Sequence, residues 1–211
     1  MRIIGHVAVL DPHGRPVPGL RGRAKDLLTY LAIHPGGANL PDIMEALWPA
    51  ATVTRAADSL STEVANLRST VRKAAGDRHA QAVHNLGGRY TLNADLLDID
   101  LWQLEQAVAA DNPAAPDRQQ RLRAAAALYA GDLATTAAHG WLEAARERCR
   151  QHTITAHQRL AAALEVVQPA EAAALLDAAD GIDPYNETLA LAAINAFAAL
   201  GATDQAQHRY E

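Results

Sequence analysis

One segment restricts the fold of this chain more than any other. Between residues 54 and 75, apolar side chains recur at steps of three and four, the spacing of a helix with one buried face. The residues of this stripe are Ala57, Leu60, Val64, Leu67 and Val71. Gly76 follows them, where a left-handed C-cap is expected. The sequence therefore predicts a long amphipathic helix over residues 54–75.

Shorter elements surround this helix. Two helices are predicted before it, near 23–34 and 41–48, with Asn39 as the N-cap of the second. After it, two β-prone runs at 82–86 and 89–92 flank a Gly-Gly pair, the pattern of a hairpin. Residues 1–21 read as short hairpin-like strands. This order of elements, with strands, three helices and a terminal hairpin, is typical of an α+β winged helix-turn-helix domain.

The second half of the sequence predicts helices throughout. They are expected near 99–110, 117–130, 140–166, 169–180, 185–200 and 203–211. Small residues at helix crossings and Pro-bounded turns are typical of helix-hairpin repeats, so we expect an all-α, TPR-like domain. The predicted domains are 1–95 and 98–211, the second cut short at its C-terminal end. We expect Leu96, Leu97, Ile99 and Leu101 to form an apolar seam between them.

Charge divides the chain in the same place. Residues 1–97 carry eleven Lys and Arg against eight Asp and Glu, whereas residues 98–211 carry eight against sixteen. Any contact with a polyanion is therefore expected in the first half, and contact with a protein or a second copy in the acidic second half.

The polar side of the 54–75 helix carries the candidate binding residues. Its short side chains let a DNA backbone approach, and its arginines can reach phosphates or guanine edges. Arg68 and Arg72 lie four apart on one face and outside the apolar stripe, so their removal is expected to cost the fold little. The candidate DNA-binding residues are Arg55, Ser59, Ser61, Thr62, Asn66, Arg68, Ser69, Arg72, Lys73 and, from the hairpin, Arg89. The competing interpretation is a surface helix with solvated charges.

No catalytic or metal-binding pattern stands out. The three serines lie outside any nucleophile-elbow motif, phosphate-cradling glycine loops are absent, and the nine histidines show no ligand spacing. We therefore expect no enzyme activity, metal or cofactor. The lone Cys149 favours a reducing cytoplasm. No apolar run is long enough to span a membrane, so no membrane contact is expected.

Several motifs in order resemble the SARP family of actinobacterial pathway regulators. The motifs are Leu27–Gly36, Ala46–Pro49, Ala56-Ala57 through Leu67-Arg68 and Val71-Arg72, Gly87–Leu92, Asp98–Leu101, Ala127–Leu133, Trp141–Glu143 and Ile182–Glu187. The resemblance implies a winged helix joined to a bacterial transcriptional activator domain, with sequence-specific binding to double-stranded promoter DNA. The 54–73 helix would then be the recognition helix, 85–89 the wing, and 49–53 a loop facing RNA polymerase. The helical domain would contact RNA polymerase or another protein, or form a homodimer.

A second hypothesis stays open beside this one. Recognition helices of the family are richer in Arg, and here Asp58, Ser61 and Ser69 stand where Arg is common. The same two-domain unit also occurs at the end of larger, membrane-anchored actinobacterial proteins. The alternative is therefore a protein-interaction module of a larger multidomain protein that does not bind DNA. A clearly positive solvent face on the 54–73 helix would favour DNA, and a neutral one the module.

Overall fold

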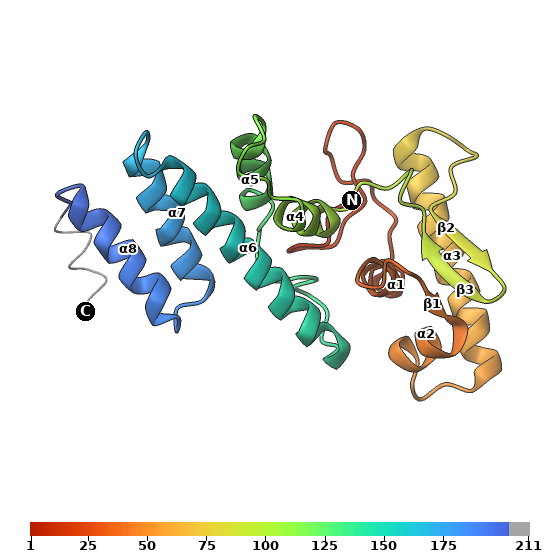
Figure 1. The fold of residues 1–211 in the computed structure, drawn as a ribbon. Helices are drawn as coiled ribbons and strands as arrows, with labels where there is room; N and C mark the ends of the chain where they lie inside the picture. Colours follow the sequence, from red (N-terminus) through yellow and green to blue (C-terminus); the bar gives the residue numbers. More distant parts are fainter. Residues whose placement is uncertain (203–211) are drawn as a thin grey trace. The chain divides into compact units, whose positions relative to one another are not determined.

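The chain forms two compact units in the computed structural model, which describes residues 1–202 (Figure 1). The first unit consists of Met1–Trp102 and Ala130–Ala145, and the second of Gln103–Tyr129 and Arg146–Glu211. Most of the structure is helical, with one small antiparallel sheet. None of the helices in the described range combines the length and hydropathy that a membrane crossing needs.

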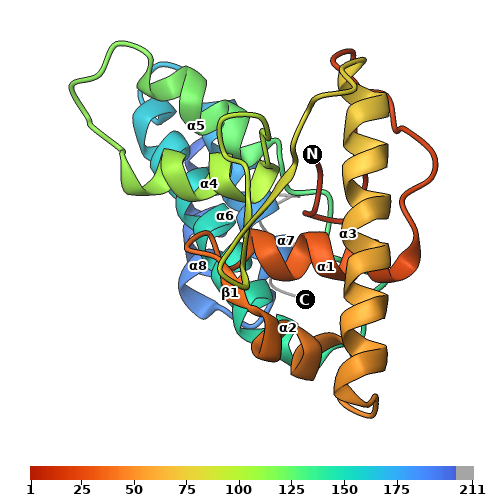
Figure 2. The same ribbon diagram turned by 90° about the vertical axis from the view of Figure 1, so that its right-hand side faces the viewer.

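The first unit contains the sheet. Its first elements are α1 (Gly22–Ala32), β1 (Ala38–Asn39), α2 (Leu40–Leu47), α3 (Val53–Ala75), β2 (Val83–Leu86) and β3 (Arg89–Leu92). The strands lie in the order β1-β3-β2, and Gly87 and Gly88 join β2 to β3 with positive φ angles. In Figure 2, α1 runs across the axis of α3.

Apolar stripes of the three helices build the core of this unit. Leu27, Leu28 and Leu31 of α1 have no exposed surface, and neither do Leu60 and Leu67 of α3. From α2, the side chains of Ile43 and Leu47 are also buried in this core. Burying a Leu or Ile side chain stabilises a fold by about 1.5–3 kcal/mol, so this cluster fixes how α3 lies against the other helices.

Gly37 sets the approach of β1 to β3. Its φ is +83°, and a Cβ at this position would lie 2.4 Å from Cγ2 of Thr91 and 2.8 Å from the carbonyl oxygen of Tyr90. A side chain there would collide with both groups, so only glycine fits without displacing the strand.

Asp100 ties the start of the helical half into the first unit. Its carboxylate accepts hydrogen bonds from the backbone N–H groups of Ile3 and Ile4 at 2.9–3.0 Å, and from Leu101 at 2.9 Å. Ile4 also forms a β-bridge with Leu133. Burial raises the pKa of Asp100, and the backbone hydrogen bonds oppose that rise. A single buried carboxylate thus holds the N-terminal segment.

Two tryptophans satisfy carbonyl groups at helix ends in the same unit. Nε1 of Trp102 donates to the carbonyl oxygen of Ala32 at 2.8 Å, and Nε1 of Trp141 donates to that of Ala46 at 3.3 Å. The last carbonyls of a helix have no partner within the helix, so each indole acts as a cap. Trp141 also packs edge-on against Tyr30, with ring centroids 5.1 Å apart.

The second unit is built from helices. Its helices are α4 (Asp100–Ala109), α5 (Arg118–Ala126), α6 (Glu143–Leu164), α7 (Pro169–Ile182) and α8 (Glu187–Ala199). The short 3₁₀ helix η1 (Gly140–Leu142) and the first residues of α4 and α6 belong to the first unit. One apolar cluster joins α5, α6 and α7 around Leu122 and Leu160. Another joins α6, α7 and α8 around Ile154 and Leu189.

Most predicted elements appear at the expected places, with three differences. Residues 1–21 form isolated bridges, Arg2 with Ala8 and Leu10 with Pro16, because Pro16 and Pro18 lack the N–H that a continuing ladder needs. Helix α5 ends at Ala126, before the predicted 130. Asn39 is the N-cap of α2, but its side chain does not cap the helix. The helix predicted at 203–211 lies outside the described residues.

The contacts also divide the chain elsewhere than between residues 95 and 98. Residues 98–102 and 130–145 pack within the first compact unit, and the domain bounds 1–95 and 98–211 stay a prediction. Leu97, Ile99 and Leu101 are buried there, whereas Leu96 is 38% exposed. Spacing along the chain could not reveal this, because the bonds involved join residues nearly 100 positions apart.

Candidate nucleic-acid interface

One face of α3 is open to solvent along most of the helix. Exposed residues follow each other at steps of three or four, so they form a single stripe. The stripe consists of Arg55, Asp58, Thr62, Ala65, Ser69 and Lys73, with Thr54 and Ser61 beside it. The side chains in its middle are short. This is the shape that allows a helix to lie deep in a major groove.

The hydroxyl groups on this face are partly engaged. The Ser61 hydroxyl donates to the carbonyl oxygen of Ala57 at 3.0 Å, and that of Thr62 donates to the carbonyl oxygen of Asp58 at 3.0 Å. Such bonds to the preceding turn occupy the proton of each hydroxyl. While they persist, both oxygens face a ligand as acceptors only.

Arg68 and Arg72 do not point into solvent with this stripe. Nη2 and Nε of Arg68 donate to the carbonyl oxygen of Val83, at 2.7 and 3.3 Å. Nε of Arg72 donates to that of Ala80 at 3.2 Å. Both arginines are half-buried, and they bind α3 to the segment that leads into and begins the hairpin. Because of these bonds, we now expect their removal to cost the fold more than the sequence alone suggested.

Two further candidates also make contacts within the chain. Nε of Arg89 donates to the carbonyl oxygen of Gly36 at 2.9 Å, and its Nη1 donates to Oδ1 of Asn39 at 3.2 Å. The amide of Asn66 accepts from the N–H of Arg21 and donates to the carbonyl oxygen of Gly19, both at 3.0 Å. Ser59 is half-buried. Of the ten candidates, Arg55, Ser61, Thr62, Ser69 and Lys73 remain on the exposed face of α3.

The exposed face of α3 carries little net charge. Arg55 and Lys73 stand at its two ends, and Asp58 lies one turn from Arg55. Glu63 is half-buried, and its Oε2 has no hydrogen-bond partner. The exposed stripe thus has a net charge of +1, although α3 as a whole contains four cations.

The tip of the β2–β3 hairpin exposes one apolar side chain. Leu86 is 80% exposed there, while the guanidinium of Arg89 is turned back to Gly36 and Asn39. Oδ1 of Asn85 accepts the N–H of Gly88 at 3.1 Å and closes the turn. The sequence pointed to Arg89 and missed Leu86 and Ala65. Helical spacing from Asp58 and Thr62 could have identified Ala65.

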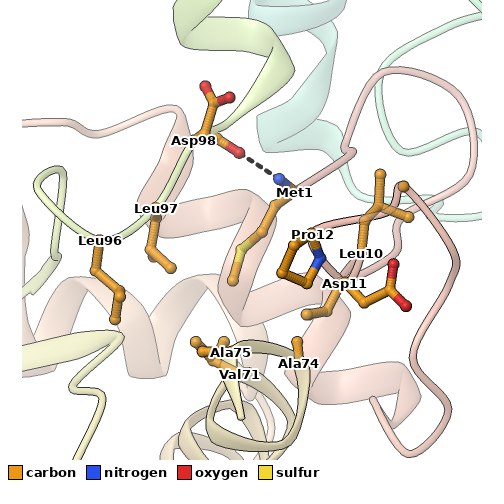
Figure 3. A pocket seen from close by; sticks show the side chains of 12 residues that line it. Met1, Leu10, Asp11, Pro12, Val71, Ala74, Ala75, Leu96, Leu97 and Asp98 are labelled. Carbon is orange, nitrogen blue, oxygen red and sulfur yellow. Dashed lines mark hydrogen bonds between the residues drawn. The ribbon is translucent and has the colours of Figure 1, made fainter. Parts of the chain in front are cut away.

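A hollow of about 400 Å³ lies at the C-terminal end of α3 (Figure 3). Val71, Ala74 and Ala75 of α3 form one wall, and Leu10 and Leu97 lie on the others. The amino group of Met1 donates to the carbonyl oxygen of Asp98 at its edge. Asp11, also in the lining, accepts the backbone N–H of Arg15, which lowers its pKa. Its lining brings no catalytic pair together.

Comparisons with known proteins add two findings. Residues 98–211 match the bacterial transcriptional activator domain. The solved structure of EmbR from Mycobacterium tuberculosis, in complex with a low-affinity phosphopeptide, has a similar fold. It superposes with a TM-score of 0.76 at 21% sequence identity, over 99% of this chain and 57% of the EmbR chain. None of the curated proteins compared with the chain matches it.

Proposed function

Because this chain belongs to the bacterial transcriptional activator domain family, we propose that it is a transcription regulator whose first unit binds duplex DNA as a winged helix-turn-helix. In this proposal α3 is the recognition helix and the β2–β3 hairpin is the wing. The family is one of transcriptional regulators, not enzymes. The observation that carries the proposal is the exposed stripe of short polar side chains along α3, with a cation at each end.

The contacts proposed for DNA differ in kind along α3. Arg55 and Lys73 reach phosphates, because they are exposed cations at the ends of the stripe. Ser61, Thr62 and Ser69 lie where base edges would pass, and a hydroxyl can accept from the amino groups of adenine or cytosine. Arg68, Arg72 and Arg89 position the hairpin and do not touch DNA.

The helical second unit serves contact with a protein in this proposal. Residues 98–211 carry sixteen acidic against eight basic side chains, which repels a phosphate backbone. RNA polymerase, another protein or a second copy of the chain remain the predicted partners. A cytoplasmic location belongs to the same proposal.

The test is selection of bound duplexes from a random-sequence pool, with gel-shift titration of the enriched sequence. Wild type should enrich a defined sequence. Ala65→Glu should weaken its binding about tenfold or more, because a carboxylate in the middle of the stripe would face phosphates and base acceptors. Ala170→Glu adds the same charge on an exposed position of α7 and should leave affinity within about twofold.

The near-neutral charge of the α3 face favours one alternative, a protein-interaction module that does not bind DNA. Under this alternative, neither wild type nor Ala65→Glu enriches any duplex, even at low salt. Enrichment abolished by Ala65→Glu but not by Ala170→Glu excludes it.

A further inference from the structure

A groove of about 470 Å³ runs between α6, α7 and α8 in the second unit. Half of its lining residues are alanines, with Leu176 and Leu200 at two further points. Glu165 is its only charged residue. The full lining is Gln158, Ala161, Ala162, Glu165, Pro169, Ala172, Leu176, Ala192, Asn195, Ala196, Ala199 and Leu200. Val166 and Val167, which follow Glu165 in the chain but are not part of the lining, are 92% and 68% exposed.

The small side chains set the shape of what can enter. Alanines on all three helices leave room for bulky side chains from a partner, and concave apolar surfaces of this kind accept the apolar face of a helix. Gln158 and Asn195 supply polar groups in the lining, so an incoming segment can be apolar on one side and polar on the other.

The charge around the groove is of one sign. From residue 160 to residue 202 the sequence contains six acidic side chains and no Lys, Arg or His. Two arginines of the same unit are engaged with other groups: Nη1 of Arg159 donates to the carbonyl oxygen of Val108 at 2.7 Å, and Arg123 pairs with Glu171 at 2.9 Å. Glu165 is therefore not neutralised by either of them.

This charge selects among the possible occupants. A second copy would bring a second acidic surface to the first one, which repels it. Residues 203–211 carry two acidic side chains and one Arg, so they do not complement the groove either. Positive charge from a partner does, because electrostatic complementarity accelerates association and favours the correct partner.

We infer that the groove between α6, α7 and α8 binds a basic amphipathic helix of a partner protein, with its apolar face on the alanines and a Lys or Arg against Glu165. The inference rests on the proposed protein contact of the helical unit and names its chemistry. It uses no residue of α3, so DNA binding and peptide binding can fail separately.

The experiment measures the fluorescence anisotropy of a labelled 18-residue peptide of Leu and Lys, arranged at helical spacing, as the full chain is added. A peptide of the same composition in scrambled order has no apolar face and should bind at least about tenfold more weakly. Replacing its Lys by Glu should abolish binding. Raising the salt concentration should weaken binding but not remove it, since the apolar contact is not screened.

Two variants locate the site, each with a matched control. Ala196→Trp fills the groove and should abolish peptide binding, whereas Ala198→Trp places the same side chain on an exposed position of α8 outside the lining and should not. Glu165→Lys should weaken binding about tenfold, and Glu187→Lys, which changes the net charge equally outside the lining, less than about threefold. Circular dichroism establishes that each variant is folded.

The inference is wrong if the scrambled peptide binds as tightly as the ordered one, or if Ala196→Trp binds like wild type. It is also wrong if the full chain binds none of the peptides. A dimer in sedimentation that Ala196→Trp dissociates would assign the groove to a second copy and overturn it too. Gel-shift titration of the same variants measures DNA binding separately, so that a loss of peptide binding can be distinguished from a loss of DNA binding.

Discussion

The two units use their arginines differently. In the first unit, Arg68, Arg72 and Arg89 donate to carbonyl oxygens 15, 8 and 53 positions away in the sequence, whereas Arg15 and Arg23 pair with nearby aspartates. In the second unit, Arg118 pairs with Asp111 at 2.7 Å and Arg123 with Glu171. Apart from the long helix α3, the first unit consists of short elements and loops, in which carbonyls such as those of Val83, Ala80 and Gly36 accept from arginines. The second consists mainly of helices that satisfy most of their own backbone, and its arginines pair mainly with acids, although Arg159 also donates to the carbonyl oxygen of Val108.

This difference explains why counting charges misjudged the face of α3. Four cations on one helix look like a phosphate-binding surface, yet two of them are structural ties to the hairpin. A cation in a unit built of loops has carbonyls within reach, and a half-buried guanidinium with its five donors is well suited to them. Sequence spacing alone does not distinguish the two uses.

The largest expected effect removes the carboxylate that holds the first unit together. Asp100→Ala leaves the N–H groups of Ile3, Ile4 and Leu101 buried without their acceptor, which should lower the free energy of unfolding by about 3 kcal/mol. Urea unfolding at pH 7 measures it. Asp95→Ala, at an exposed position, should change it by less than about 0.5 kcal/mol. Equal stability of the two variants would refute the role of Asp100.

A smaller effect is expected at the contact of β1 with β3. Gly37→Ala should cost about 2 kcal/mol or more, because the new Cβ meets Thr91 and the Tyr90 carbonyl at a positive φ. Gly22→Ala is the control, since a Cβ there meets nothing within 4 Å. The same urea titration compares them, and a Gly37→Ala protein as stable as wild type would contradict the close approach.

Arg68→Ala tests the comparison of the units directly. We expect a loss of about 1–2 kcal/mol in the free energy of unfolding, because the carbonyl of the fully buried Val83 loses its donor. Arg55→Ala, on the exposed stripe, should cost less than about 0.5 kcal/mol. If both substitutions leave stability unchanged, Arg68 is not a structural tie.

The smallest effect is a pH dependence in the second unit. Hydrogen bonding to Arg118 holds the pKa of Asp111 below its ordinary value of 3.8. The stabilisation is therefore complete above about pH 4 and is lost as the pH falls through the lowered pKa. Asp111→Asn should lose less stability than wild type between pH 5 and pH 2.5, by about a few tenths of a kcal/mol in denaturant titrations. A parallel loss in both proteins would contradict the pair.

Much of the fold could be predicted from the sequence, because helical periodicity and Gly or Pro breaks are local signals. The 54–75 helix, its C-cap at Gly76 and the hairpin around Gly87 and Gly88 were found this way. The resemblance to SARP-type regulators is confirmed by the domain match over residues 98–211. The packing of residues 130–145 into the first unit was not predictable, since it depends on the contact of Ile4 with Leu133.

The candidate site was predictable only in part, for a related reason. Periodicity assigned the exposed side of α3 correctly for Arg55, Ser61, Thr62, Ser69 and Lys73. It could not show that the side chains of Arg68 and Asn66 hydrogen-bond to other segments of the chain, because their partners, Val83 and Gly19, lie 15 and 47 positions away. Whether any of these residues contacts DNA stays a prediction.

The salt dependence of DNA binding tests most directly whether Arg55 and Lys73 contact phosphates while Arg68 and Arg72 do not. If only the two exposed cations act, the log–log slope should be about -2 per copy, against about -4 if all four do. Lys73→Ala should make the slope shallower by about 0.9, whereas Arg68→Gln should lower affinity through the hairpin and leave the slope unchanged. If Arg68→Gln changes the slope as much as Lys73→Ala does, Arg68 contacts a phosphate and the proposed division between the two pairs of cations is wrong.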